Sequence, residues 1–358
     1  MTEPKTGQAK GRLLFVDHAK ALGILMITYG HITELGNGVD RWMSLFKVSV
    51  FFVTAGFVLA MSGSWKRQPM SLLVKKRLIS LGIPYVTFSA LTIVIRVGAH
   101  YLKTSGGRKL LKEFLFRFFT LRGLFPLWFL PVLFIAEILF LLILKSGSRL
   151  LLGLTFLWPI LVTCLTSRYI DRNRALLDEL NVKMDLTLVL SKAVIAVWFL
   201  AVGYMAYFLF AKMRTQPGLF AGLLLIALTI LLSRLTKGID VNMMKLGQHP
   251  ALFYAGGVAG SLGSLLIFRF LEEKRVSLPL LTYFGQNSLA LMGLQRGALI
   301  INVTQRGFAS VSAIDKAPGL RYHVQCLAVL AMVLVTTYGA TELIKRYCPW
   351  MLGRLKKR

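Results

Sequence analysis

The sequence predicts an all-α, polytopic integral membrane protein with about ten transmembrane helices. Three observations lead to this fold class. The chain has 358 residues, 56% of them hydrophobic, and its mean hydropathy is +0.65. Apolar runs of about 18 residues or more follow one another along the whole chain. The 43 Lys and Arg residues, against 15 Asp and Glu, gather in the short connections and at the ends of these runs.

The apolar runs define a single transmembrane domain over residues 1–358, with a short N-terminal tail before residue 13 and a basic C-terminal tail from residue 345. An even number of spans places both termini on one side, and the basic tail and basic connection 63–77 predict that this side is cytoplasmic. The connection 32–42 then faces outside. The predicted spans are 13–31, 43–62, 78–101, 124–144, 150–167, 187–210, 218–235, 250–270, 278–301 and 324–344.

The connection 102–123 is also basic, although this topology places it outside. Its apolar residues recur at helical spacing, which predicts an amphipathic helix lying in the membrane interface. These residues are Leu110, Leu111, Phe114, Leu115 and Phe118.

The formal net charge of +28 does not require nucleic acid as a partner, because anionic lipid headgroups and membrane topology account for most of it. A phosphorylated donor or substrate is a second explanation for part of the excess. The three cysteines and five histidines are scattered, so we expect no disulfide framework, no metal site and no bound cofactor.

The first span carries three ionisable residues of interest: Asp17, Lys20 and His31. Charged groups at membrane depth are expensive and are therefore functional candidates. In a helix, Lys20 and His31 share one face about 16 Å apart, and Asp17 lies close enough to Lys20 to pair with it. The alternative is an ion pair that serves packing, together with an interfacial histidine.

Further candidates follow in the next spans. Lys47 should lie at the membrane level of His31, because a short connection returns the chain from that histidine, and nearby Gly56 is typical of close helix packing. The cluster Lys75, Lys76 and Arg77 either anchors the topology or binds phosphate.

Two more candidates belong to the fourth span. Trp128 is either an aromatic-belt anchor at the membrane interface or a residue on the substrate side. Glu137 lies at membrane depth, where a carboxylate requires a partner or a functional explanation.

The order of these motifs resembles acyltransferase family 3 of membrane O-acyltransferases. The shared features are an Asp with a basic residue and a His after it, FF-x-x-x-GF, an Arg before Pro-Tyr, and Leu-Trp-Phe-Leu. The similarity covers essentially the whole chain. The branch it is most similar to contains the fucose-4-O-acetylase-like and exopolysaccharide acetyltransferases.

This resemblance implies acetyl transfer, usually from acetyl-CoA, to a hydroxyl of an exported or cell-envelope glycan or its lipid-linked repeat unit. It implies that His31 is catalytic, together with Asp17 and Lys20. It implies that Arg77, flanked by Lys75 and Lys76, binds the phosphates of the donor.

Three departures from the family pattern concern acceptor recognition. Lys47, Val48 and Ser49 stand where the family often has His-Met-Pro, Gln295 replaces a His at the end of GQNSLALMGLQ, and Leu133 replaces a Glu. The substrate-side candidates are Lys47, Trp128, Glu137, Asn287 and Gln295.

The sequence therefore predicts an O-acetyltransferase of a bacterial inner membrane, working with membrane lipids and polysaccharide assembly machinery. A glycan exporter without acyltransferase activity is the alternative, since exporters also tolerate intramembrane charges. A scaffold subunit of a polysaccharide synthase is a third reading. The combination of Asp17, Lys20, His31 and Arg77 favours the enzyme.

Overall fold

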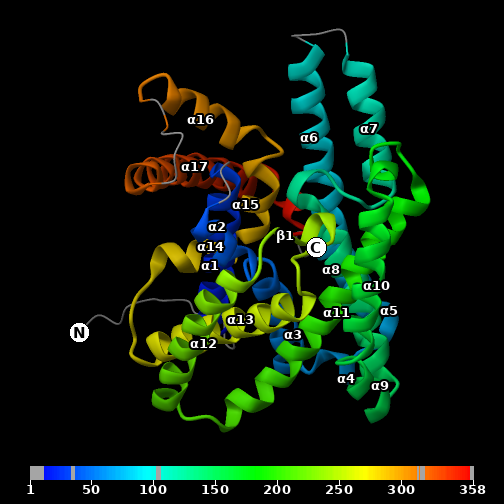
Figure 1. The fold of residues 1–358 in the computed structure, drawn as a ribbon, viewed down its shortest axis with the longest axis vertical. Coiled ribbons are helices and arrows are strands. Elements are labelled where there is room, and N and C mark those ends of the chain that lie inside the picture. Colours follow the sequence, from blue (N-terminus) through cyan, green and yellow to red (C-terminus); the bar gives the residue numbers. More distant parts are fainter. Residues whose placement is uncertain (1–11, 34–36, 102–105, 313, 315–318, 355–358) are drawn as a thin grey trace.

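The computed structural model describes residues 12–33, 37–101, 106–312, 314 and 319–354. Within these residues the chain is almost entirely helical, which confirms the predicted fold class (Figure 1). Most of the N-terminal tail, Lys103 and the last four residues of the basic C-terminal tail lie outside the described residues.

The bundle is built from long helices joined by shorter helices and turns. The long helices are α1 (Leu14–Ile32), α3 (Ser49–Ser62), α6 (Ile83–Tyr101), α7 (Gly107–Phe119), α8 (Phe129–Lys145), α10 (Trp158–Arg172), α11 (Val182–Lys212), α12 (Thr215–Leu235), α13 (Pro250–Glu273) and α17 (Leu320–Tyr347). The shorter helices are α2 (Gly38–Ser44), α4 (Ser64–Arg67), α5 (Met70–Arg77), α9 (Arg149–Leu154), α14 (Pro279–Gln286), α15 (Ser288–Gln295) and α16 (Ile300–Ala309).

The remaining elements are short turns and one small hairpin. A π-helical turn, η1 (Leu78–Gly82), joins α5 to α6, and the 3₁₀ turns are η2 (Phe125–Trp128), η3 (Arg174–Leu177), η4 (Val241–Met243) and η5 (Pro349–Leu352). Strands β1 (Ile239–Asp240) and β2 (Lys245–Leu246) pair antiparallel, with Ile239 opposite Leu246.

Seven helical stretches of the described residues are long and apolar enough to cross a membrane, so the expected count of ten is not confirmed. They are Gly38–Ser62, Met70–Tyr101, Phe125–Lys145, Val182–Lys212, Thr215–Leu235, Pro250–Glu273 and Leu320–Tyr347. Helix α1 is not among them, because Asp17, His18 and Lys20 lower its mean hydropathy.

Two predicted spans do not form continuous helices. The stretch 150–167 breaks between α9 and α10, because Pro159 lacks the N–H group that a continuous helix would need and instead occupies the first turn of α10. The stretch 278–301 breaks at Asn287, whose backbone leaves the helical region, and again at Leu299, which has a left-handed φ of 60°. Local backbone chemistry overrides the apolar run at these places.

Helix α1 lies inside the bundle and packs against α14, α13, α3 and α17. Another close helix contact joins α3 to α11. A Cβ atom at Gly56 would lie 2.0 Å from the carbonyl oxygen of Leu200, and one at Gly203 would lie 1.9 Å from that of Val53. The packing interpretation of Gly56 is therefore confirmed, because only glycine permits this approach.

The basic connection 102–123 contains the expected amphipathic helix, α7, which stands beside α6 in Figure 1. Phe114 of α7 is buried, and the ring of Phe118 stacks on that of Tyr85 with the centroids 5.2 Å apart. Helix formation is confirmed. Its location in the membrane interface stays a prediction.

Candidate functional site

The first turns of α1 form a charged cluster. Lys20 Nζ lies 2.7 Å from the buried carboxylate of Asp17, which confirms the predicted pair, and Arg12 Nε donates to the same carboxylate at 2.6 Å. The carboxylate of Glu272 on α13 accepts hydrogen bonds from the backbone N–H groups of Leu14 and Phe15. These bonds satisfy two of the free donors that every helix N-terminus carries.

Lys20 also lines a cavity of about 280 Å³ between α1, α3, α8 and α15. Arg77 and Glu137 lie in the same wall, and Arg77 Nε is 2.7 Å from Glu137 Oε2. The hydroxyls of Thr54 and Ser80 add polar groups. We call this space the Lys20–Arg77 cavity. It brings together three residues singled out in the sequence from three different helices.

The π-helical turn η1 directly follows Arg77 and forms part of this wall. Pro84 lacks an N–H group and its ring crowds the carbonyl one turn earlier, so the regular α-helical bonding pattern cannot continue through this region. A π turn at Leu78–Gly82 accommodates the change. Such turns are frequent at functional sites, and this one contributes Ser80 and Leu81 to the cavity.

The other members of the basic cluster do not line the cavity. Lys75 and Lys76 are exposed, and Lys76 Nζ donates to the side-chain oxygen of Gln68 at 2.9 Å. Only Arg77 of the three predicted phosphate-binding residues therefore reaches the interior. The helical rotation between adjacent positions points the two lysines away.

His31 lies at the opposite end of α1 and does not line the Lys20–Arg77 cavity. The cations that act on it electrostatically are Lys47 and Arg296. Lys47 also pairs with Asp40 at 3.1 Å, and its Nζ would lie 3.0 Å from a Cβ at Gly30. The expected common level of Lys47 and His31 is thus confirmed. We call His31, Asp40, Lys47 and Arg296 the His31 cluster.

Two arginines, Arg296 of this cluster and its neighbour Arg96, were not singled out in the sequence analysis. Arg96 on α6 donates to the carbonyl oxygen of Arg296 and, at 3.3 Å, to the side-chain oxygen of Asn302. Its guanidinium carbon lies 3.9 Å from the ring centroid of Phe125, and that of Arg296 lies 6.0 Å from the same ring. The sequence did contain a signal for both arginines, because each is a charged residue inside a predicted membrane span, as Glu137 is.

Gln295 and Asn287 hold neighbouring helices rather than line the cavity. Gln295 is fully buried, and its Nε2 donates to Thr28 Oγ1 at 2.6 Å. Thr28 lies about one helical turn before His31 on α1. Its side-chain oxygen is buried without a hydrogen-bond partner among the described residues. Asn287 Nδ2 donates to the carbonyl oxygen of Tyr283 at 2.9 Å and so closes the end of α14.

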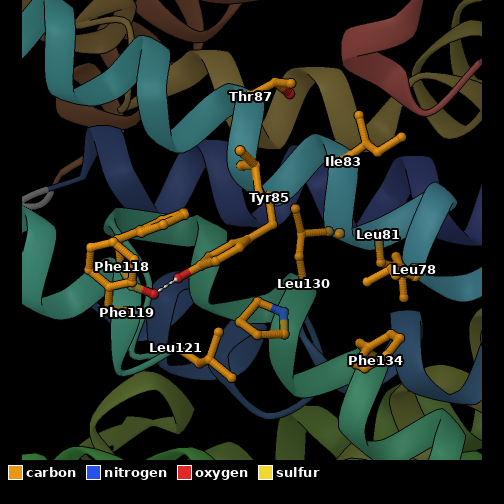
Figure 2. A pocket seen from close by; sticks show the side chains of 13 residues that line it. Leu78, Leu81, Ile83, Tyr85, Thr87, Phe118, Phe119, Leu121, Leu130 and Phe134 are labelled. Atoms are coloured by element: carbon orange, nitrogen blue, oxygen red, sulfur yellow. Dashed lines mark hydrogen bonds between the residues drawn. The ribbon is translucent and has the colours of Figure 1, made fainter.

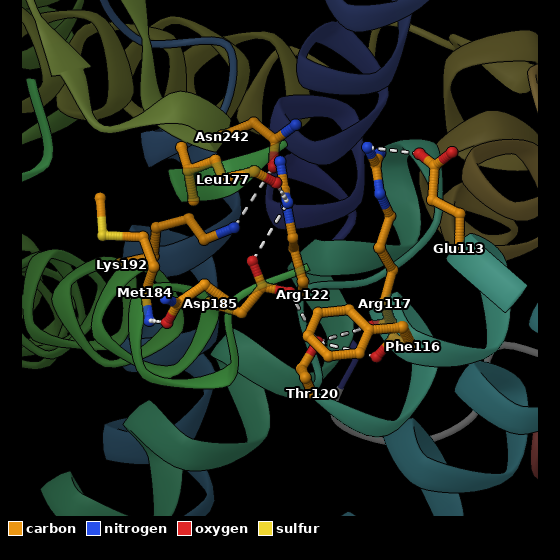
Figure 3. A network of polar contacts seen from close by, with 11 residues as sticks. Glu113, Phe116, Arg117, Thr120, Arg122, Leu177, Met184, Asp185, Lys192 and Asn242 are labelled. Carbon is orange, nitrogen blue, oxygen red and sulfur yellow. Dashed lines mark hydrogen bonds and ion pairs between the residues drawn. The ribbon is translucent and has the colours of Figure 1, made fainter. Parts of the chain in front are cut away.

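Trp128 is buried inside the bundle, so its interpretation as an aromatic-belt anchor is wrong. Lys192 of α11 is fully buried, and its Nζ lies 4.5 Å from the centroid of the Trp128 ring. The same Nζ donates to Asn242 Oδ1 at 3.2 Å (Figure 3). Lys192 interrupts a predicted span and could have been found by that signal.

Beside this lysine, Arg122 pairs with Asp185 at 3.1 Å (Figure 3). Thr120 Oγ1 donates to the same carboxylate at 2.8 Å, and Arg122 also donates to the carbonyl oxygen of Leu177 at 2.7 Å. Burial lowers the pKa of Arg122, and the carboxylate of Asp185 opposes that shift. These contacts tie the segment after α7 to the start of α11 and thereby position η2 and Trp128.

The arrangement has two polar ends joined by one helix. The Asp17–Lys20 end opens into a cavity that offers positive charge, and the His31 end offers a proton-transfer group among cations. A family profile described as an acyltransferase domain matches residues 13–340, a range that contains both ends of α1 and the Arg77–Glu137 pair. Comparisons with curated proteins and with solved structures give no significant match. The chain therefore belongs to acyltransferase family 3 and is a membrane acyltransferase.

Proposed function

We propose that this enzyme transfers an acetyl group from acetyl-CoA to a sugar hydroxyl of an exported or cell-envelope polysaccharide, or of its lipid-linked repeat unit. The proposed location is the bacterial inner membrane, beside the machinery that assembles the polysaccharide. The observation that carries the proposal is the cavity lined by Lys20, Arg77 and Glu137 on the helix bundle that also presents His31.

The cavity suits an anionic donor. Arg77 and Lys20 offer N–H groups that form strong, charge-assisted bonds with phosphate oxygens. Glu137 Oε2 accepts no well-aligned hydrogen bond from the described residues, although it lies 2.7 Å from Arg77 Nε. A phosphate can therefore replace this carboxylate as the partner of Arg77. The exposed Lys75 and Lys76 add positive charge on the flank of the same helix.

His31 is the proposed base. It accepts the proton of the sugar hydroxyl while the hydroxyl oxygen attacks the carbonyl carbon of the thioester. The new C–O bond forms, the C–S bond breaks, and the thiolate of the donor leaves and takes up a proton. Lys47 and Arg296 lie where they can stabilise negative charge that develops on the carbonyl oxygen. An alternative role for His31 is to carry the acyl group itself.

The test is transfer from labelled acetyl-CoA by the purified protein in lipid nanodiscs, with the glycan fraction of the same cells as acceptor. Label in the glycan supports the proposal. Hydrolysis of acetyl-CoA without any acceptor would support acetyl-CoA as the donor but would leave the glycan without support as the acceptor. Movement of glycan across vesicle membranes without any acetyl transfer would favour the exporter.

The donor site has its own matched pair of variants. Arg77→Ala should weaken acetyl-CoA binding about ten- to a hundredfold, because charge-assisted hydrogen bonds contribute ~1.5–3 kcal/mol. Arg67→Ala is the control, since the Arg67 side chain donates to the backbone oxygen of Ser62 outside the cavity. Equal, small effects at both positions would make the basic cluster a topology anchor.

A further inference from the structure

An apolar cavity of about 530 Å³ lies beside the Lys20–Arg77 cavity, between η1, the start of α6, the end of α7 and the start of α8 (Figure 2). Its walls offer hydrocarbon almost exclusively. The hydroxyls of Tyr85 and Thr87 in this wall already donate to backbone carbonyl oxygens, that of Tyr85 to Phe118 at 2.8 Å, as Figure 2 shows. A hydrophilic ligand such as a sugar finds no free partner here, so its site lies elsewhere on the bundle.

A smaller pocket, of about 320 Å³, lies between α2 and the last turns of α12. Its chemistry is different, because two arginines line it, Arg41 from α2 and Arg234 from α12. The side chain of Trp42 forms part of the same wall. We call this space the Arg41–Arg234 pocket. None of these three residues has a part in the reaction proposed above.

The two arginine side chains have free donors. Neither forms a hydrogen bond or an ion pair with the described residues. Asp40, which precedes Arg41 in the chain, is paired with Lys47 instead. A guanidinium group presents its N–H donors as a planar fork that matches a carboxylate or a phosphate. Two such groups in one pocket therefore favour an anionic ligand.

The Trp42 ring in the same wall is held in place. Its Nε1 donates to Thr229 Oγ1 on α12 at 2.7 Å, and it packs edge-on against Phe46 with the ring centroids 5.5 Å apart. The indole is thus a rigid apolar wall beside two cations. A sugar ring has an apolar C–H face and polar edges, so a sugar that carries an acidic group matches both features of the pocket.

Membrane topology gives no other reason for these cations. Helix α2 also carries Asp40 of the His31 cluster, so the pocket lies at the His31 end of the bundle. The predicted topology places that end outside, where the positive-inside rule does not call for Lys or Arg. The negative surface potential that draws basic segments to lipid headgroups belongs to the cytoplasmic leaflet. An anionic ligand therefore accounts for Arg41 and Arg234 better than lipid does.

We propose that the Arg41–Arg234 pocket binds an acidic sugar of the acceptor, such as a uronic acid, so that the acceptor is an anionic glycan. The inference rests on the proposed function for the transfer to a glycan at His31. The acidic sugar occupies the pocket, and a neighbouring sugar of the same glycan presents its hydroxyl to His31. The head of the donor binds in the Lys20–Arg77 cavity, so donor and acceptor sites lie toward opposite ends of α1. The headgroup of an anionic membrane lipid is the competing occupant.

The experiment measures binding, so that it does not depend on turnover. Trigalacturonic acid and its fully methyl-esterified form, which has the same sugars without the charges, are titrated onto the full-length protein in phosphatidylcholine nanodiscs. Wild type should bind the acid at least about tenfold more tightly than the ester, because hydrogen bonds from arginine to a carboxylate are charge-assisted. Added salt should reduce this preference, since the two arginines are accessible.

Single substitutions locate the effect. Arg41→Gln and Arg234→Gln should each weaken binding of the acid about tenfold and leave binding of the ester unchanged. Neither substitution breaks an ion pair of the described residues. Arg306→Gln is the matched control, because Arg306 is exposed on α16 and does not line the pocket. Its neighbour Gln305 donates to the backbone oxygen of Ile32, which places the control at the same end of α1.

Equal affinities of wild type for the acid and the ester would overturn the inference. A loss of acid binding in Arg306→Gln as large as in Arg41→Gln would also overturn it, because the general charge of this end of the bundle would then hold the acid. Thermal stabilisation by phosphatidylglycerol that Arg41→Gln removes, without any preference for the acid, would assign the pocket to a lipid headgroup. Acid-selective binding through both arginines supports the inference even if no acetyl group is transferred, and in that case the proposed transfer alone fails.

Discussion

Arg77 and Glu137 face each other across the wall of a cavity, with Nε 2.7 Å from Oε2. The arginine side chain is 32% exposed and the glutamate side chain 5%, so the pair has a buried carboxylate and an accessible cation. This asymmetry leaves Arg77 able to meet a ligand while Glu137 depends on Arg77 for its neutralisation.

A double-mutant cycle can distinguish the contribution of the Arg77–Glu137 pair to protein stability from its contribution to donor binding. Arg77→Leu leaves a buried carboxylate unpaired and should lower stability by about 3–5 kcal/mol. Arg77→Leu with Glu137→Leu should recover most of that loss, because neither charge remains buried. Donor binding should stay weak in both variants. Thermal unfolding in detergent and acetyl-CoA titration measure the two properties.

If the double variant regains donor binding together with stability, Arg77 serves only to neutralise Glu137. Arg67→Leu is the control for the loss of a positive charge on the same side of the bundle. It should change neither quantity, because the Arg67 side chain is exposed and donates to the backbone oxygen of Ser62 at the end of α3.

His31→Ala should abolish detectable glycan acetylation while membrane insertion and protein level stay normal. General acid–base catalysis contributes about 10²–10⁴-fold in rate, which is sufficient for this loss. The measurement is label transfer by nanodisc protein. Near wild-type transfer by His31→Ala would remove this histidine from the mechanism.

The control for His31 is decided by the structure. His18, one residue after Asp17 and about 100° around the helix, is only 2% exposed, and its Nε2 lies 2.9 Å from Thr282 Oγ1. Its replacement is expected to disturb packing between α1 and α14. His249 is exposed at the start of α13, so His249→Ala is the better control and should keep full activity.

The contact between α3 and α11 predicts a packing effect. Gly56→Ala places a methyl group 2.0 Å from a backbone oxygen that cannot move independently, so overpacking should destabilise the protein by about 1–3 kcal/mol. Gly98→Ala adds the same methyl group where no atom lies within 4 Å. Unfolding of the two variants in detergent compares them directly. Equal stability would mean that the two helices are not in close contact.

The buried Arg122–Asp185 ion pair should contribute far more to the stability of the fold than a solvent-accessible ion pair does. Arg122→Ala leaves a fully buried carboxylate without its cation and should lower stability by about 3–5 kcal/mol. Arg174→Ala removes the partner of Asp171, whose side chain is 54% exposed, and should lower stability by no more than about 1 kcal/mol. Similar losses in both variants would contradict the assigned burial.

The topology predicted from the charge distribution places both termini in the cytoplasm. A reporter that is active only in the cytoplasm should therefore be active when it is fused to either terminus. A reporter that is active only in the periplasm should be inactive at both termini. A reporter within residues 37–42, between α1 and α3, should show the opposite behaviour. Terminal fusions that are active only in the periplasm would invert this topology.

The sequence by itself determined the fold class, the Asp17–Lys20 pair and the common level of His31 and Lys47. It did so because mean hydropathy requires a membrane bundle, and because the α-helical repeat fixes distances within one helix or across one short connection. The close packing at Gly56 followed in the same way from a small residue within an apolar run.

Only the tertiary structure decided which residues from different helices meet. The sequence did not reveal that Glu137 is the partner of Arg77, that Lys75 and Lys76 point away, or that Lys192 lies over Trp128. It also presented the broken stretches 150–167 and 278–301 as continuous apolar runs. The physical reason is that apolar runs specify burial in lipid without specifying neighbours, whereas helix packing and local backbone breaks choose which side chains share a cavity.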